Sequence, residues 1–208
     1  MGVSARQERR EQLAAIQEAQ RRADRRRTRI VIGAAIAVAI ALVVPTVIVV
    51  VNAERRSQEL EEAAAAPIDG VREFADLSAT HTTEDVVYDQ TPPVGGDHHP
   101  TWQNCGFYDA PVVEEHAVHS LEHGAVWLTY DPELPETDVD ALRDLADRQT
   151  YLLVSPLEGT RGVVASAWGV QVALDGADDA RLEPFLLAYL QGPQTPEPGA
   201  PCSGGVGA

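Results

Sequence analysis

Short blocks of apolar and polar positions in the second half of the chain predict a series of strands and helices. Apolar runs closed by turn residues indicate strands. Apolar positions spaced three and four apart indicate helices. Strands are expected at Ala125 to Tyr130, Tyr151 to Val154, Val163 to Trp168 and Val170 to Leu174, and helices at about 113–123, at Asp138 to Gln149, and from Asp178 or Asp179 to Gln191. This order predicts an α+β domain, a small mostly antiparallel sheet with helices packed on one face.

The longest apolar block lies near the start of the chain. Ile30 to Val51 comprises 22 residues without a charge, which is long enough to cross a bilayer as one helix. Nine arginines precede it, against four acidic residues, and only Arg55 and Arg56 follow closely. The positive-inside rule therefore predicts a single-pass signal-anchor with a cytoplasmic N-terminus and an extracytoplasmic C-terminal domain.

A cleaved signal peptide is the alternative, because Val51-Asn52-Ala53 resembles a small-residue cleavage site. The charged leader and the apolar run are both long for such a peptide. We therefore favour the uncleaved anchor in the cell membrane, and both interpretations export the main domain.

The composition differs between the predicted cytoplasmic, membrane and exported parts of the chain. The expected parts are a cytoplasmic Arg-rich segment (1–29), the transmembrane helix (30–51), a stalk (52–67), an exported globular domain (68–202) and a flexible tail (203–208). Residues 57–208 hold 27 acidic residues and five arginines, which argues against binding nucleic acid through its phosphates. The arginines before the membrane segment are expected to contact anionic lipid headgroups. A protein partner in the cell envelope is left open.

Candidate chemistry is concentrated in residues 115–124. A helix turns by about 100° per residue, so His116, His119 and His123 fall within a sector of roughly 60°, flanked by Glu115 and Glu122. Imidazoles and carboxylates on one helix face are typical ligands of divalent transition metals.

A loop supplies further candidates, because residues 91–100 (TPPVGGDHHP) contain too many prolines and glycines for a regular element. We predict a site for zinc or copper(II), with a role in envelope metal handling or interaction. The predicted ligands, in order, are His98, His119, His123, His116, Glu122, Glu115 and His99.

Two alternatives to metal handling stay open. The histidines can form a structural network in a non-enzymatic envelope interaction module, with pH sensing near their ordinary pKa of about 6.5. The segment His119 to His123 also matches the His-x-x-Glu-His pattern of zinc hydrolases, in which the glutamate activates water. No histidine follows His123 as a third ligand, so a non-enzymatic role is favoured.

The only cysteines are Cys105 and Cys202, both on the side predicted to be exported. Two cysteines in an oxidising compartment most simply form one disulfide. The alternative is that Cys105 acts as a thiolate ligand beside the histidines.

The chain resembles a bacterial family known as domain of unknown function 3105. The resemblance is carried over residues 88–202 by Tyr88, Pro92-Pro93, His98, Trp102, Cys105-Gly106-Phe107-Tyr108, Glu115, His116, His119 to Gly124, Tyr130, Ala167-Trp168-Gly169, Pro196-Glu197 and Cys202. It implies a membrane-anchored or exported protein in which the histidine helix, the Pro/Gly/His loop and the cysteines act as one unit. The resemblance does not indicate which reaction, if any, the protein catalyses. It also ranks His98 above His99 as a ligand.

Overall fold

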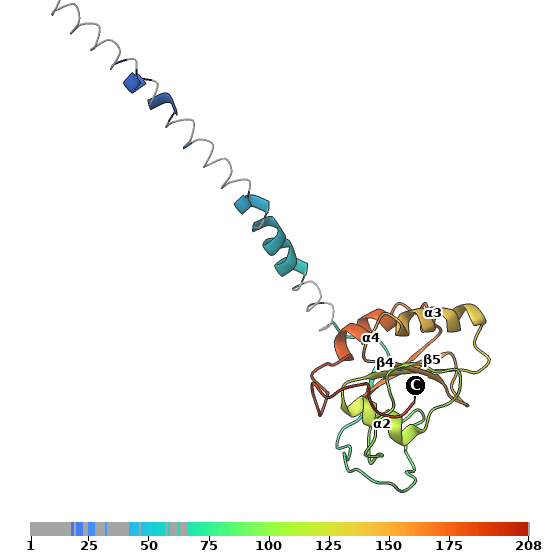
Figure 1. The fold of residues 1–208 in the computed structure, drawn as a ribbon. Helices are drawn as coiled ribbons and strands as arrows, with labels where there is room; N and C mark the ends of the chain where they lie inside the picture. The colour runs from blue at the N-terminus through green and yellow to red at the C-terminus, as the bar shows by residue number, and fades with distance from the viewer. Residues whose placement is uncertain are drawn as a thin grey trace, which may run out of the picture. The chain divides into compact units, whose positions relative to one another are not determined.

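The computed structural model describes residues 66–207 without interruption. Before that range it describes residues 18, 20–22, 25–27, 32, 42–45, 47–56, 58 and 62. The chain divides into two compact units, Met1–Gln58 and Glu59–Ala208. All of the sheet and all of the candidate chemistry belong to the second unit (Figure 1).

Most of the predicted transmembrane segment (30–51) lies outside the described residues, as does most of the Arg-rich segment (1–29). Those that are described in the apolar segment, residues 32, 42–45 and 47–51, are helical. Within the described part of the chain, no helix is both long enough and apolar enough to span a membrane.

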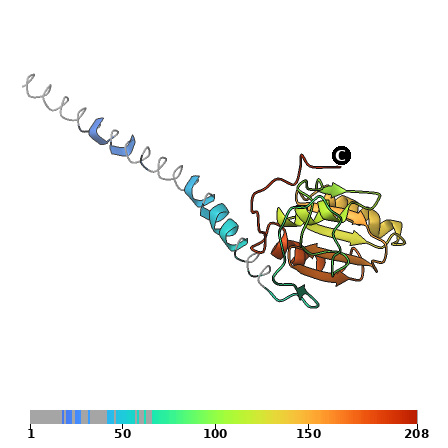
Figure 2. The same cartoon turned by 90° about the horizontal axis from the view of Figure 1, so that it is seen from below.

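Six strands form one mixed sheet in the second unit. They are β1 (Arg72–Glu73), β2 (Gly106–Phe107), β3 (Val126–Tyr130), β4 (Leu152–Pro156), β5 (Val163–Ala167) and β6 (Val170–Leu174), in the spatial order β1-β6-β5-β3-β4-β2. Strand β4 pairs in parallel with β2 and β3, whereas β3–β5, β5–β6 and β6–β1 are antiparallel. Figure 2 shows these strands side by side.

Helices cover both faces of this sheet. The helices are α2 (Glu114–Glu122), α3 (Glu136–Ala146) and α4 (Leu182–Tyr189). Helices α3 and α4 pack on one face over Val126, Leu128 and Val154. Helix α2 lies on the opposite face, where Leu121 packs on Trp127 and Leu153 (Figure 1).

The prediction that helices pack on one face is therefore wrong, although the α+β class stands. The physical reason lies in the central strands, since every residue of β3 and β4 is buried. Successive side chains of a strand point to opposite faces. Both faces therefore carry apolar side chains that need cover, and α2 provides it on the second face.

The last helix begins later than the pattern predicts. It starts at Leu182 and not at Asp178 or Asp179. The Asp179 carboxylate accepts hydrogen bonds from the backbone N–H and the guanidinium of Arg181. These bonds hold the pKa of Asp179 well below its usual range, and they organise the turn before α4 instead of capping the helix.

Candidate metal centre

Helix α2 positions two histidines of the centre, His119 in its last turn and His123 directly after its last residue. His119 and His123 are both 3% exposed, and their Nε2 atoms lie 2.9 Å apart. The helix ends at Glu122, and Gly124 follows with a φ of +96°. This left-handed conformation is typical of a residue after a helix C-terminus. It allows the chain to turn directly into β3, which fixes the direction of the histidine face.

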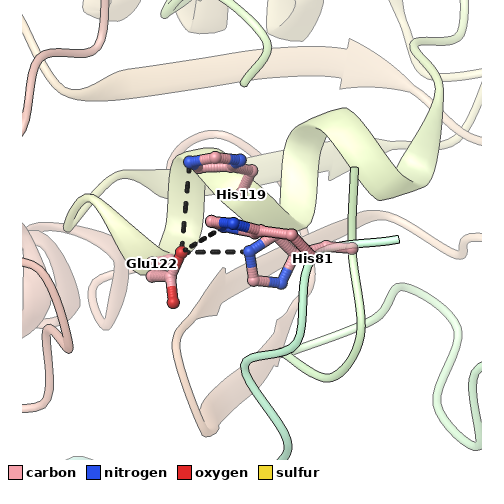
Figure 3. A group of neighbouring side chains, drawn as sticks. His81, His119 and Glu122 are labelled. Carbon is pink, nitrogen blue, oxygen red and sulfur yellow. Dashed lines mark hydrogen bonds and ion pairs between the residues drawn. The ribbon is translucent and has the colours of Figure 1, made fainter. Parts of the chain in front are cut away.

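Glu122 lies at the middle of the cluster. Its Oε2 atom is 3.0 Å from Nε2 of His98, 3.5 Å from Nε2 of His81 and 4.0 Å from Nε2 of His119. Figure 3 shows the rings of His81 and His119 turned toward this carboxylate. The glutamate side chain is only 4% exposed. A charged carboxylate buried to this degree requires positively charged or hydrogen-bonding partners, and three imidazoles surround it.

Two loop segments bring His98 and His81 to the helix. An isolated bridge pairs His81 with His98. The N–H of Thr82 donates to the carbonyl of His98, and the N–H of His98 donates to the carbonyl of Thr80. His98 is fully buried, whereas 44% of the His81 side chain is exposed. The His81 ring stacks on His119 with centroids 4.8 Å apart.

Backbone carbonyls determine the tautomer of the three buried histidines. Nδ1 lies 2.7 Å from the Gly96 carbonyl in His98, 2.6 Å from the His99 carbonyl in His119 and 2.7 Å from the Pro201 carbonyl in His123. A carbonyl oxygen only accepts, so each Nδ1 carries the proton. In the neutral form of such a ring, the Nε2 atom is a free acceptor. Metal-bound histidines commonly have this outer contact, which orients the ring and fixes the free nitrogen.

With the proton on Nδ1 of each histidine, one hydrogen-bond acceptor faces another at two points of the cluster. Nε2 of His98 faces Oε2 of Glu122 at 3.0 Å, and Nε2 of His119 faces Nε2 of His123 at 2.9 Å. Two lone pairs at such distances repel unless a positive charge lies between them. Each of the two contacts therefore requires a proton or a metal ion.

Burial keeps His119 neutral at ordinary pH. Removal from water lowers the pKa of His119 to about 4, against the opposing effect of the hydrogen bond to the His99 carbonyl. The neighbouring rings of His123, His98 and His81 also contribute to this lowering of the pKa. A neutral imidazole is the form that binds a metal ion.

The C-terminal segment closes the other side of the centre. The Glu197 carboxylate, 52% exposed, lies 3.6 Å from Nε2 of His123, and the Glu197 N–H donates to the carbonyl of Glu122. Cys202 forms a disulfide with Cys105, with Cα atoms 5.4 Å apart. The disulfide therefore holds the segment that provides Glu197 and the Pro201 carbonyl, and Cys105 has no thiolate for a ligand. Residues 205–206, at the start of the predicted flexible tail, pair with residues 102–104.

The structure does not bring three of the predicted ligands to the cluster. His116 donates from Nδ1 to the Thr101 carbonyl, and its ring packs on His99 with centroids 4.2 Å apart. Nδ1 of His99 accepts from the Thr101 N–H. Glu115 accepts from the N–H of Val86. These contacts fasten the loops to α2. Among the described residues, two sets have atoms close enough to hold an ion: His81, His98, His119 and Glu122; and His119, His123 and Glu197.

Sequence reasoning missed His81 and Glu197. His81 stands alone in a polar stretch, and only the bridge to His98 brings it to the cluster. One feature of the sequence pointed to His81: all six histidines of the chain lie within residues 81–123. Glu197 is one of many acidic residues. The one indication that the segment around Glu197 lies near α2 was the disulfide of Cys202, five residues later, with Cys105.

Comparison with known proteins supports a family assignment that covers the whole centre. No curated protein and no solved structure matches the chain. The family model described as "Protein of unknown function (DUF3105)" matches residues 80–204, a range that includes every residue of the two sets. This chain belongs to the DUF3105 family.

Proposed function

We propose that the protein is a membrane-anchored, extracytoplasmic metal-binding protein that handles a divalent transition metal in the cell envelope. One observation carries the metal-binding part. The three buried histidines each commit Nδ1 to a backbone carbonyl and direct Nε2 into one cluster with Glu122. A purely structural histidine has no need of a free Nε2 opposite another acceptor.

The donor types favour zinc or copper(II). Imidazole nitrogens suit both ions, whereas soft copper(I) is selected by thiolates and thioethers. Both cysteines are in the disulfide, and the one methionine is Met1. The extracytoplasmic location rests on the disulfide, which persists in oxidising compartments, and on the charge bias around residues 30–51.

The test uses the full-length protein, solubilised in detergent and purified without a histidine tag. Elemental analysis and thermal unfolding with added zinc or copper(II) measure binding. We expect bound metal and a higher unfolding temperature for the wild type. Glu122→Gln, which removes the central carboxylate, should weaken both effects. Glu115→Gln on the same helix is the matched control and should retain them. A metal-free wild type that added metal does not stabilise would instead support a proton-sharing histidine network.

Hydrolysis is a second candidate function, favoured by Glu197. The His-x-x-Glu-His pattern lacks a third ligand in the nearby sequence, but Glu197 lies 3.6 Å from Nε2 of His123 in the folded domain. His119, His123 and Glu197 then correspond to the ligands of a zinc hydrolase, with Glu122 next to them. Cleavage of a peptide library by the zinc-loaded protein, abolished by Glu122→Gln, would support this function. Absence of cleavage would exclude peptide hydrolysis.

A further inference from the structure

The cluster contains six side chains that divide into two similar sets. His119 belongs to both sets. When His119 is assigned to the second set, each set consists of two histidines and one carboxylate: His81, His98 and Glu122; and His119, His123 and Glu197. Each set has one solvent-exposed member, the 44% exposed His81 in the first and the 52% exposed Glu197 in the second. The remaining four side chains are buried. Each set therefore has its own contact with solvent.

The two acceptor–acceptor contacts fall one in each set. His98 and Glu122 form the contact in the first set, and His119 and His123 form the contact in the second set. A single metal ion placed at one contact leaves the other contact dependent on a proton. Resting on the metal-binding function proposed above, we infer that the domain holds two divalent transition-metal ions side by side, one at each contact.

His119 lies close to both sets but can bind only one of the two ions. His119 is close enough to Glu122 to join the first set. However, its Nδ1 is committed to the His99 carbonyl, so the ring has one nitrogen for one ion. When both positions are filled, His119 pairs with His123, which is its nearer neighbour. Each ion then has three protein ligands and retains coordination positions for water, as in catalytic rather than closed structural sites.

The charge of the surroundings is compatible with two dications. Glu122 and Glu197 contribute one negative charge to each position, and residues 57–208 carry a large excess of acidic over basic residues. Such an excess raises the local concentration of cations.

Counting bound ions tests the inference. Metal-free full-length protein is titrated with cobalt(II) or zinc, and the ions per chain are counted by native mass spectrometry. We expect two ions at saturation in the wild type. Glu197→Ala should weaken the second ion about tenfold or more and leave the first ion in place. Since Glu197 is exposed, this change does not disturb the core. Glu158→Gln, an exposed carboxylate in the turn after β4, is the matched control and should retain both ions.

Copper(II) gives an independent readout of the separation between the ions. Two neighbouring copper(II) ions broaden each other's paramagnetic resonance and give a half-field signal, whereas the Glu197→Ala variant should show one isolated ion. A wild type that saturates at one ion overturns the inference and leaves the proposed function standing. A Glu197→Ala variant that still binds two ions as tightly as the wild type also overturns it. A wild type that binds no metal removes both.

Discussion

The carbonyl oxygen of Pro201 lies 2.7 Å from Nδ1 of His123 and directly precedes Cys202 of the disulfide. This contact links the covalent crosslink to the tautomer of a candidate ligand. The covalent bond is made to Cys105, next to Asn104, which itself pairs with the C-terminal end of the chain. The state of the disulfide should therefore affect metal binding as well as stability.

We predict that the Cys105→Ser, Cys202→Ser double variant binds metal about tenfold more weakly than the wild type. Loss of the crosslink frees the segment that provides Glu197 and the Pro201 carbonyl. The crosslink joins residues 97 apart, so its loss should also lower the free energy of unfolding by about 4 kcal/mol. Competition with a chelator and urea denaturation measure the two effects. An unchanged metal affinity would contradict the link between the disulfide and the centre.

The pH dependence of stability should reveal the neutral state of His119. In the folded, metal-free protein its pKa is about 4, whereas an unfolded histidine has a pKa of about 6.5. The unfolded chain therefore binds an extra proton between these values, and the folded state loses stability as the pH falls from about 6.5 to about 4. We expect a loss on the order of 2 kcal/mol from this residue. Its contribution is complete above the unfolded pKa.

Urea denaturation of chelator-treated protein at about pH 7 and about pH 4.5 measures this slope. Other groups also titrate in this range, so the wild type is compared with His119→Gln. The variant should be less stable at both pH values but show a flatter pH dependence. Parallel curves for the two proteins would contradict the assignment.

A methyl group at Gly124 should destabilise the junction between α2 and the C-terminal segment. In Gly124→Ala the new Cβ would lie 2.9 Å from Oγ1 of Thr195 and 3.1 Å from Cα of Gln191. We expect a loss of at least about 2 kcal/mol from the strained φ and the crowding together. Gly159→Ala is the matched control, since its φ of +84° is also positive but nothing lies within 4 Å of the new Cβ.

The difference between these two variants isolates the crowding from the backbone strain. Thermal and urea unfolding measure it. Because the crowding falls next to His123 and the segment with Glu197, Gly124→Ala should also weaken metal binding, whereas Gly159→Ala should not. Equal losses of stability in the two variants would mean that the close packing of the C-terminal segment on α2 contributes little.

Tryptophan fluorescence should report copper(II) binding directly. The Trp102 ring lies 4.9 Å from His123, and the Trp168 ring lies 5.8 Å from His98. Copper(II) quenches nearby indoles through its partly filled d shell, whereas zinc does not. We expect strong quenching by copper(II) and little change with zinc. The variants Trp102→Phe and Trp168→Phe should each remove part of the quenched emission. Quenching that survives in the double variant would come from Trp127 or from ions bound elsewhere.

The sequence alone predicted the part of the centre that depends on local spacing. His119 and Glu122 lie in the last turn of α2 and His123 directly follows it, so helical periodicity brings the three side chains together. His116 shares the same sector, but its ring turns to the Thr101 carbonyl, two residues further along the loop than the His99 carbonyl that His119 contacts. Periodicity predicts which face a side chain shares. It does not predict which backbone group of the covering loop each histidine meets.

The remaining parts depend on long-range packing. His81 reaches the centre through a single bridge between two loops, for which no local pattern exists. The second helical layer was also invisible in the sequence, because β3 and β4 are apolar on both faces and show no alternation. A strand buried on one face can be recognised by its period of two, whereas a strand buried on both faces cannot.

The centre draws its six side chains from four separate stretches of chain, beginning at residue 81 and ending at residue 197. No earlier part of the chain contains all the groups of the centre, because Glu197 and the Pro201 carbonyl come last in the sequence. Loading of the complete centre with metal is therefore possible only after the C-terminal segment has packed against α2.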